Sequence, residues 1–423
     1  MTAKRCALLM PAMPTPYDVV VAGAALNGLA TAVALSGPYV RRPVSTLIID
    51  AKDPRAFAQN SFDGRASAIT ASAKRMLEAL GVWQRVAAQA QPMTEIIVTD
   101  SQDPARRPTL LQFGPDDMDN GPSSYMVENR FLYQAMLDVA LASPHVTLQS
   151  GQKIADYQFA PGLAQVTLED GQVVKASLIA AADGKASPAR AAAHIEMIGW
   201  AYDQMGIVAT VAHETPHHGR AEEHFRASGP FAILPLPGNR SSLVWVETKV
   251  EAARILALDD EGFTAELRQR FGLHLGALRL DSGRHGYPLS LFVAKSFTGP
   301  RLALVGDAAH VLHPLAGLGF NLGLRDVAAL AECVVDAVAL GQDIGGDAVL
   351  ENYARWRRFD TMKAAVAMDG MNRLFSNDNA FLRLLRDSGL MMVERMAPLK
   401  KMFTREAAGL SGPQPKLLQG LQL

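Results

Sequence analysis

A stretch of about 33 residues near the start of the chain constrains the fold more than any other feature. The run at 18–22 (DVVVA) is rich in β-branched residues, which is typical of a buried parallel strand. Gly23 and Gly28 then turn the chain into an alanine-rich helix over 29–35, and a second buried-type strand follows at 45–50. Because strand, glycine-rich turn, helix and strand form a βαβ unit, we expect an α/β fold with a parallel sheet.

The spacing of these glycines is that of a dinucleotide-binding turn. In such turns three glycines allow a tight bend, close approach of a pyrophosphate and close helix–strand packing. Gly23 and Gly28 take the first and third places, and Ala25 takes the second. Asp50 ends the second strand, where a carboxylate can accept hydrogen bonds from ribose hydroxyls. The pattern predicts a Rossmann-like nucleotide site, although a turn that serves only packing would contain the same glycines.

The pattern of elements changes twice along the chain. Residues 231–236 and 242–247 flank Gly238-Asn239, which predicts an antiparallel hairpin in a sheet-rich second region. A buried-strand pattern returns at 301–306, so we expect a discontinuous first domain with part of the second region inserted. Helices are expected over 66–91, 129–142 and 321–340. The expected divisions are a disordered leader at 1–16, a first domain at 17–194 and 296–345, an antiparallel β-sheet domain at 195–295 and a helical C-terminal region at 346–423.

The composition limits the partners and the compartment. The formal net charge of the 423 residues is −1, which argues against nucleic acid as a partner. Cys6 and Cys333 are too few and too far apart for a disulfide framework or a zinc site, so we expect a reducing compartment. No run of 18 apolar residues occurs, and the apolar run after Lys4 and Arg5 is too short for a secretory signal. We therefore expect a cytoplasmic protein.

A second motif places an acidic residue at the end of a strand. Asp183-Gly184 follows an apolar strand at 178–182, and Ser187 and Pro188 are expected to begin the next helix. Ligands of open α/β sheets bind at this carboxyl edge. A generic Asp-Gly turn would have the same sequence.

A third motif has three ligand-binding features within about 20 residues. Asp307 follows a buried strand, where it can accept hydrogen bonds from a sugar-alcohol hydroxyl. Gly317 and Gly319 let the backbone lie against a flat ligand. The helix that follows presents its N-terminus to the same loop, which favours a phosphate or an electron-rich ring oxygen.

Together the three stretches resemble the FAD-binding aromatic hydroxylases of the p-hydroxybenzoate hydroxylase type. The run from His313 to Asp326 (HPLAGLGFNLGLRD) is similar to the signature of the ubiquinone-biosynthesis hydroxylases in that group. The likeness covers about residues 17–415. It departs at Ala25, where glycine is usual, and at Leu318, where glutamine is usual. These departures concern the pyrophosphate geometry and the surroundings of the flavin.

The resemblance implies a role for each matching residue toward a non-covalently bound FAD. Gly23 and Gly28 would hold the pyrophosphate, and Asp50 would hold the adenosine ribose. Asp307 would hold the ribityl chain, and Asp183 would serve both FAD and the reduced nicotinamide nucleotide. The other cofactor-binding residues that it implies are Arg65 near the flavin cleft, Arg130 at the pyrophosphate, and Pro314, Gly317, Gly319, Phe320 and Asn321 along the isoalloxazine. Arg130 has a plainer interpretation as a solvated residue near a helix start.

The same resemblance implies an FAD-dependent monooxygenase. NAD(P)H would reduce the flavin, and O₂ would add to form a C4a-hydroperoxyflavin. This species would hydroxylate the aromatic ring of a polyprenyl phenol in ubiquinone biosynthesis. The alternatives are hydroxylation of a soluble phenol and a non-catalytic, flavin-binding role in a ubiquinone-synthesis complex. No catalytic residue or general base can be named from the sequence, and the spacing of His213, His217 and His218 does not predict a metal site.

The C-terminal region combines basic and apolar residues. Between Arg355 and Lys416 there are twelve Lys or Arg and six Asp or Glu. A basic amphipathic surface suits contact with anionic lipid, and a polyprenyl substrate resides in the bilayer. This predicts a peripheral location on the inner face of the membrane, with Lys400, Lys401 and Arg405 as contacts. The alternative is a helical lid whose arginines pair with acidic residues such as Asp360 and Glu394.

Overall fold

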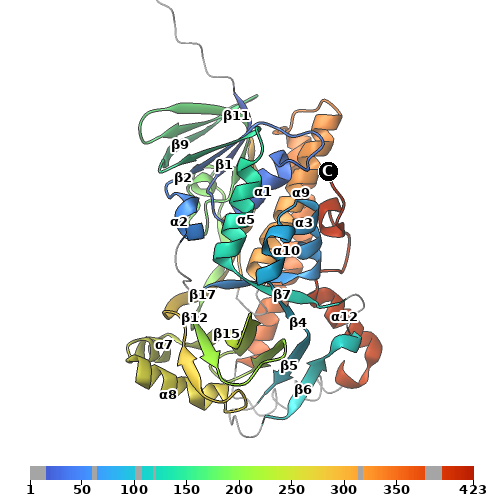
Figure 1. Cartoon of the computed structure of the whole chain (residues 1–423). Helices are drawn as coiled ribbons and strands as arrows, with labels where there is room; N and C mark the ends of the chain where they lie inside the picture. Colours follow the sequence, from blue (N-terminus) through green and yellow to red (C-terminus); the bar gives the residue numbers. More distant parts are fainter. Residues whose placement is uncertain (1–15, 60–63, 101–106, 118–120, 313–317, 377–392) are drawn as a thin grey trace, which may run out of the picture.

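The computed structural model describes residues 16–59, 64–100, 107–117, 121–312, 318–376 and 393–423. A parallel sheet with its helices forms one half of the molecule, and an antiparallel sheet forms the other half (Figure 1). The expected leader falls almost entirely on residues 1–15, which lie outside the described residues. None of the described helices has both the length and the apolar character needed to cross a membrane.

The first sheet is built around the predicted βαβ unit. Its main path runs through β18 (Thr298–Gly299), β19 (Leu302–Leu304), β11 (Val173–Ala181), β1 (Tyr17–Ala22), β2 (Thr46–Asp50) and β8 (Val146–Ser150). The pairings from β19 to β8 are parallel, while β10 (Ala164–Leu168) and β9 (Ile154–Phe159) extend β11 as an antiparallel ribbon. The carboxyl ends of β1, β2, β11 and β19 therefore meet at one edge, where ligands of such sheets bind.

Helices cover this sheet and form most of the large core. α1 (Leu26–Ser36) packs against α5 (Asn129–Leu141) and α9 (Leu318–Ala339), and α10 (Asp347–Phe375) packs against α9. Leu29 and Leu35 of α1 are fully buried against the sheet side. The helices expected over 129–142 and 321–340 correspond to α5 and α9, and α10 begins the expected helical C-terminal region. Apart from the helices described below with the second and third sheets, the shorter helical segments are α2 (Pro54–Gln59), α6 (Pro188–Ala192), η2 (Pro115–Asp117), η3 (Gly306–Ala308), α12 (Ala397–Ala407) and η5 (Lys416–Gln419).

The second sheet is antiparallel apart from one pairing. Its order is β20 (His310–Val311), β17 (His285–Ala294), β12 (Met197–His213), β15 (Arg240–Thr248), β14 (Phe231–Leu236), β13 (Arg220–His224), β5 (Glu95–Thr99) and β6 (Thr109–Phe113), with β16 (Leu278–Leu280) beside β12. The predicted hairpin around Gly238 is confirmed as β14 and β15. β5 and β6 come early in the chain yet join this sheet through a parallel pairing of β5 with β13. The domain boundaries at 194 and 295 stay a prediction.

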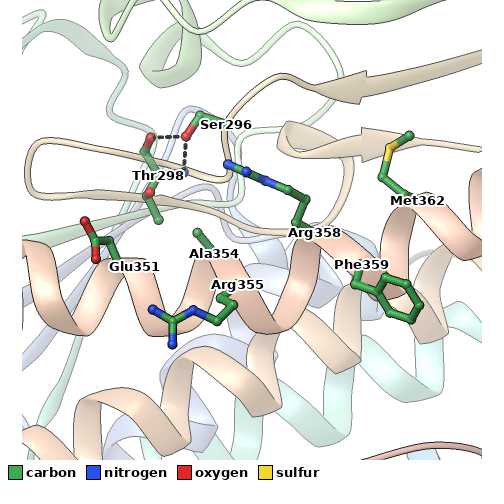
Figure 2. A pocket seen from close by; sticks show the side chains of 8 residues that line it. All are labelled: Ser296, Thr298, Glu351, Ala354, Arg355, Arg358, Phe359 and Met362. Atoms are coloured by element: carbon green, nitrogen blue, oxygen red, sulfur yellow. Dashed lines mark hydrogen bonds between the residues drawn. The ribbon is translucent and has the colours of Figure 1, made fainter.

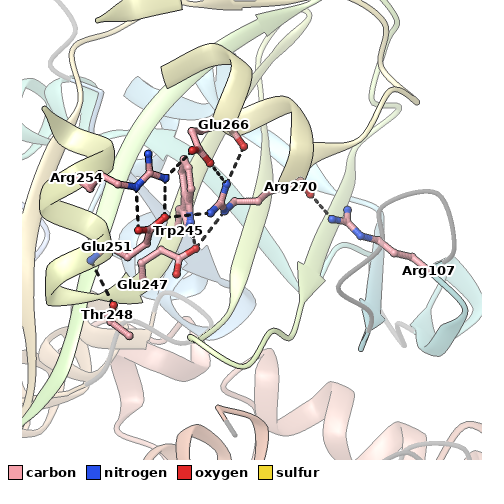
Figure 3. Close-up of polar contacts among 8 residues, drawn as sticks. All are labelled: Arg107, Trp245, Glu247, Thr248, Glu251, Arg254, Glu266 and Arg270. Carbon is pink, nitrogen blue, oxygen red and sulfur yellow. Dashed lines mark hydrogen bonds and ion pairs between the residues drawn. The ribbon is translucent and has the colours of Figure 1, made fainter. Parts of the chain in front are cut away.

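Two helices support the second sheet from its outer side. α7 (Lys249–Leu256) and α8 (Asp260–Phe271) pack on it around Trp245, which is fully buried. The Arg270 guanidinium lies 4.6 Å from the Trp245 ring and pairs with Glu266 and Glu247 (Figure 3). These ion pairs hold α8 against one face of the sheet. The opposite face of the sheet is directed toward the first half of the molecule.

The third sheet corrects one prediction. A single helix was expected over 66–91, but residues 66–70 form β3 (Ala66–Thr70), which pairs with β7 (Ser124–Glu128), and β7 pairs with β4 (Gln91–Met93). The helix begins only after Thr70, whose hydroxyl caps it by accepting from the Ala73 N–H. Gly81, with a φ of +72°, ends the first segment. The helical part is therefore divided into α3 (Ala71–Ala79), α4 (Trp83–Val86) and η1 (Ala87–Gln89).

A buried carboxylate connects the loop after β19 to two helices. Asp326 on α9 is fully buried and accepts from the Gly306 N–H at 2.9 Å, from His310 Nε2 at 2.7 Å and from Arg357 Nε of α10 at 2.6 Å. Burial alone would raise the pKa of the Asp326 carboxyl, but His310 and Arg357 lower it below its ordinary value. Arg357 also pairs with Asp360 at 2.6 Å. The network fixes the loop that carries Asp307.

We expect Asp326→Ala to destabilise the fold strongly. The change leaves the buried Arg357 charge with Asp360 as its remaining partner in the described structure and leaves His310 without its acceptor. Removal of one partner of a buried ion pair typically costs about 3–5 kcal/mol. Urea unfolding would measure the loss. Asp336→Ala is the matched control, because this aspartate lies on the same helix with its side chain 58% exposed, and should cost less than about 0.5 kcal/mol. Equal losses in the two variants would contradict the assigned role.

Candidate functional site

The glycine-rich turn after β1 leaves no room for side chains at two positions. Gly23 has a φ of +102°, and a Cβ there would lie 2.4 Å from the Ala182 carbonyl oxygen. A Cβ on Gly28 would lie 1.9 Å from the Gly23 carbonyl oxygen. Both contacts are far below van der Waals distance, so the turn, α1 and the end of β11 fit together only with glycine.

The departure at Ala25 is compatible with a phosphate site. Ala25 is the N-cap of α1 with a φ of −70°, which any residue adopts, and its methyl group is exposed. No side chain caps this N-terminus, and the first turn has no acidic residue. The free N–H groups and the positive end of the helix dipole remain available to an anion.

Asp50 supports the turn from the neighbouring strand. Its carboxylate accepts from the Ala24 N–H at 2.6 Å and from the Lys52 N–H at 2.7 Å. The side chain therefore lies at the turn, as the sequence predicts for a ribose-binding carboxylate. Its contact with an adenosine ribose stays a prediction.

Two buried oxygens at the sheet edge have no hydrogen-bond partner within the described structure. Asp183 accepts from the Ala189 N–H at 3.0 Å through Oδ2, while its Oδ1 is unpaired. Burial raises the pKa of this carboxyl. Asn27 Oδ1 is likewise buried and unpaired, and the Asn27 side chain lies where a Cβ on Gly306 or Gly323 would be. Buried polar atoms without partners are costly, so both oxygens point to a ligand that is bound in the functional state.

Asp307 lies on the same edge, in η3 directly after β19. Its side chain is exposed, and no described hydrogen bond or ion pair involves its carboxylate. The pKa of the Asp307 carboxyl is raised because neighbouring elements exclude part of the solvent around it, and nearby His310 and Lys185 act in the opposite direction. The Asp326 network behind the loop holds this free acceptor in place.

The start of α9 places three predicted residues in different environments. Gly319 has open space in front of it, since no described atom lies within 4 Å of the position that a Cβ would take there. Phe320 is half-buried and packs against the core. The Asn321 amide bonds the backbone of β3, donating to the Ala68 carbonyl at 2.7 Å and accepting from the Thr70 N–H at 3.0 Å. Pro314 and Gly317 lie outside the described residues.

The two predicted arginines flank the junction of the three sheets. Arg65 is exposed just before β3, and its carbonyl accepts from the Asn129 N–H at 3.0 Å. Arg130, at the start of α5, pairs at 2.8 Å with Glu128, which is almost fully buried. Glu128 also pairs at 2.7 Å with Arg240 of the second sheet. Glu128 was not predicted as a site residue from the sequence, although its place two residues before Arg130 was the available signal.

Two of the histidines noted in the sequence hydrogen-bond other groups of the protein. His213 hydrogen-bonds the Thr215 carbonyl and the Ser241 hydroxyl, and His217 bonds the Leu236 carbonyl. No group of three or more metal-binding side chains occurs among the residues that the structure describes.

The residues of this edge fit a long cofactor that is held at two ends. The Gly23–Gly28 turn offers an anion site at one end, and Asp307 with the open surface at Gly319 offers a hydroxyl acceptor and a flat face at the other. The unpaired oxygen of Asp183 follows β11, which lies between β1 and β19 in the sheet, and the unpaired oxygen of Asn27 belongs to the glycine-rich turn itself. This arrangement suits the pyrophosphate, ribityl chain and ring system of FAD.

We expect Asp307→Ala to weaken FAD binding by about one to two orders of magnitude. Charge-assisted hydrogen bonds contribute about 1.5–3 kcal/mol each, and each 1.4 kcal/mol corresponds to about tenfold in affinity. Titration of the apoprotein with FAD, followed by flavin fluorescence, measures the change. Asp170→Ala, in the exposed β10–β11 turn, should bind FAD like the parent. Unchanged affinity in a folded Asp307→Ala variant would remove Asp307 from the site.

Curated relatives match the chain over nearly its whole length. The chain is 44% identical over 409 residues to "Ubiquinone hydroxylase UbiL" of Rhodospirillum rubrum, a match that covers 96% of this chain and 93% of that protein. It is 32% identical to "3-demethoxyubiquinol 3-hydroxylase" of Escherichia coli, covering 93% of this chain and 99% of that one.

Solved structures and a family model agree with the fold described above. A p-nitrophenol 4-monooxygenase from Pseudomonas putida superimposes with a TM-score of 0.79 at 18% identity, covering 95% of this chain and all of that one. At this identity the likeness concerns the fold alone. The model of the FAD binding domain matches residues 16–367, from the first strand to the middle of α10. The chain therefore belongs to the family of proteins built on this FAD-binding domain.

Proposed function

We propose that the chain is an FAD-dependent monooxygenase that uses NAD(P)H and O₂ to hydroxylate the aromatic ring of a polyprenyl phenol in ubiquinone biosynthesis. The observation that carries this proposal is the two-ended cofactor site at the sheet edge, with Asp307 free at one end and the glycine turn at the other. The two curated relatives named above bear hydroxylase names of the ubiquinone and ubiquinol series.

The chain's own residues hold and shield the reacting groups. When bound, FAD supplies the acceptor for hydride and the ring that activates O₂. Asp307 would hold the ribityl chain and the turn at Gly23 would hold the pyrophosphate, and together they would set the position of that ring. An apolar cluster between the third and second sheets, which includes Met126, Ala221 and Leu236, excludes water from the adjoining space. An apolar surface also suits a prenylated ring, and dry surroundings limit wasteful reactions with water.

The proposed activity can be tested directly. The FAD-loaded protein should oxidise NAD(P)H in the presence of a short-chain prenyl phenol and release a product that carries an oxygen atom from ¹⁸O₂. Mass spectrometry detects the product, and Asp307→Ala supplies a flavin-poor control. Flavin binding with no oxidation for any phenol would support the accessory role instead. Turnover of soluble phenols but no prenyl phenol would reassign the substrate.

We also propose that the outer face of α10 contacts an anionic membrane surface, from which a polyprenyl substrate would be taken. This face exposes large apolar side chains: Phe359 is 78% exposed, Val366 68% and Met362 47%. Arg355 and Arg358 lie among them, and neither has an ion-pair partner within the described part of the chain. Basic residues beside exposed apolar ones are the composition of interfacial helices.

A groove lies along the first half of this face. It has a volume of about 660 Å³ between α10 and the turn after β17, and its lining residues are Ser296, Thr298, Glu351, Ala354, Arg355, Arg358, Phe359 and Met362 (Figure 2). Near the other end of α10, the Arg373 guanidinium lies 5.1 Å from the ring of Trp200, which is 40% exposed on β12. Tryptophan at such a place is typical of a membrane–water interface.

Of the three basic residues first expected to contact lipid, Lys400 is less suited to it, whereas Lys401 and Arg405 are exposed on α12. Lys400 is largely buried and pairs with Asp117 at 3.1 Å and Glu394 at 3.0 Å. Arg357 and Arg325 both pair with Asp360. These pairs agree with the alternative of a helical lid for that part of the tail. The membrane proposal is argued from α10, and contact with a protein of a ubiquinone-synthesis complex is the alternative use of its exposed face.

The combined change Arg355→Glu and Arg358→Glu should weaken binding to anionic vesicles. Each basic residue near an anionic surface contributes about 1 kcal/mol, so the loss of two should lower affinity by about 30-fold or more at low salt. Flotation with phosphatidylcholine vesicles, with and without phosphatidylglycerol, measures this. Arg41→Glu with Arg42→Glu, also an exposed pair, is the charge-matched control. A parent protein that ignores anionic vesicles would contradict the proposal and favour a protein partner.

A further inference from the structure

Glu223 lies on the face of the second sheet that looks toward the candidate cofactor site. It is on β13, two residues after Ala221 and two before Phe225. Phe225 directly follows the strand and continues its pairing, since its N–H donates to the Thr99 carbonyl at 2.9 Å. Side chains alternate along a strand, so these three share a face. Ala221 belongs to an apolar cluster with Ala68 of β3 and Met126 of β7. Phe225 stacks on Phe375 of α10, with ring centroids 3.8 Å apart.

These two contacts bracket the Glu223 side chain. Four residues of strand span about 13 Å, so Glu223 lies midway between the place where the sheet meets β3 and the place where it meets α10. That length along the strand exceeds the width of an aromatic ring. At the end of this interval that meets β3, the Ala68 carbonyl accepts from the Asn321 amide of α9. Asn321 comes two residues after Gly319, where the surface is open. The interval therefore adjoins the end of the site that suits the flavin ring.

The surroundings of the Glu223 carboxyl are apolar. Its direct neighbours across the sheet are Val98 of β5 and Ala232 of β14. No hydrogen bond or ion pair to this carboxyl occurs within the described structure, yet the residue is partly accessible. The side chain of Glu223 is thus partly accessible in apolar surroundings.

The adjacent Glu222 has the opposite environment. It points to the other sheet face, where His224 and His274 bond it at 3.1 and 2.9 Å. These histidines outweigh burial and lower the pKa of Glu222 to about 2. Burial alone raises the pKa of Glu223 to about 7. A carboxylate with a pKa near neutrality is suited to accept and return a proton.

Other charged residues on the same sheet face lie further along the strands. Asp100 follows the end of β5, and Arg240 begins β15, where it pairs with Glu128 and Asp281. From α10, the packed residues Met368 and Phe375 are apolar. None of these groups contributes to the pKa shift of Glu223, which has burial as its only cause.

We propose that Glu223 is a catalytic residue that binds the phenolic hydroxyl of the substrate and takes its proton as the ring is hydroxylated. The inference rests on the proposed function, since it needs a phenol in the interval described above.

The proton step is balanced within the site. The O–H bond of the phenol breaks, an O–H bond forms on the Glu223 carboxylate, and the electron pair stays on the phenol oxygen. The ring becomes a stronger nucleophile toward the oxygen atom that O₂ and NAD(P)H supply in the proposed reaction. When the hydroxylated ring carbon releases its hydrogen as a proton to solvent, the ring oxygen recovers the proton from Glu223 and the carboxylate is restored.

Glu223→Gln tests this inference with little change of shape. General acid–base groups typically contribute about 10²–10⁴-fold, so the hydroxylation rate should fall by about 100-fold or more while FAD stays bound. The carboxylate must be ionised to accept a proton, so parent activity should rise with pH through about 7. This rise of activity with pH should be absent in Glu223→Gln and should return in part in Glu223→Asp. Glu261→Gln, at an exposed site on α8, is the matched control and should behave like the parent.

A binding measurement gives a readout that does not depend on turnover. The probes are 2-prenylphenol and its methyl ether, which lacks the O–H donor. The phenol should bind the parent about tenfold more tightly than it binds Glu223→Gln, because a hydrogen bond to a charged acceptor is about twice as strong as one to a neutral acceptor. The ether should bind both proteins alike.

The outcomes separate the two claims. A parent that hydroxylates no phenol would overturn the proposed function. A parent that hydroxylates prenyl phenols while Glu223→Gln keeps its rate, pH profile and phenol affinity would overturn the role of Glu223 alone.

Discussion

The buried carboxylate of Asp326 is the constraint on which the arrangement of the site depends. A single anion receives a backbone N–H from Gly306, an imidazole from His310 and a guanidinium from Arg357. Those donors come from the loop after β19, from β20 and from α10, so one side chain of α9 joins both main sheets to two helices. Burying such a charge is unfavourable unless every neighbour compensates it. The three donors keep the Asp326 charge compensated only in this arrangement of loop, strand and helices. The loop that carries Asp307 is therefore held in one position.

Close backbone contact imposes a second constraint at the other end of the site. Gly23 and Gly28 each meet a backbone carbonyl at a distance that excludes a Cβ, and Gly306 has a φ of +61°, which favours glycine. The neighbour of Gly306 is the Asn27 side chain, which comes from the glycine-rich turn itself. The two ends of the site are thus in direct contact through Asn27, and a change of backbone position at one end must alter the other. A long cofactor that is held at both ends requires the two binding loops to keep a fixed position relative to each other.

Much of the fold follows from local pattern, and the failures share one physical cause. The βαβ unit, the β14–β15 hairpin and α5 are encoded by residues that are close in sequence, so periodicity and turn residues predict them. The strand at 66–70 was missed because its partner β7 lies more than 50 residues away and nothing local favours a strand over a helix. The hydrogen bonds of the Asn321 amide to the backbone of β3 were also not predictable from local sequence, and the contact of Asn321 with the flavin stays a prediction. Glu128 and Lys400 also acquire their roles from distant partners.

The neighbouring glutamates of β13 show why sequence alone cannot assign chemistry to a residue. Glu222 and Glu223 are the same residue type at consecutive positions, so composition, propensity and spacing treat them alike. The strand geometry directs them to opposite faces. One face supplies two histidines and the other supplies only apolar neighbours, so their pKa values move in opposite directions. A carboxylate held by permanent donors is a structural anion, whereas one that is partly accessible in apolar surroundings keeps its acceptor capacity for a ligand. What separates the two is the tertiary pairing of β13 with β5 and β14, because that pairing determines which face is enclosed.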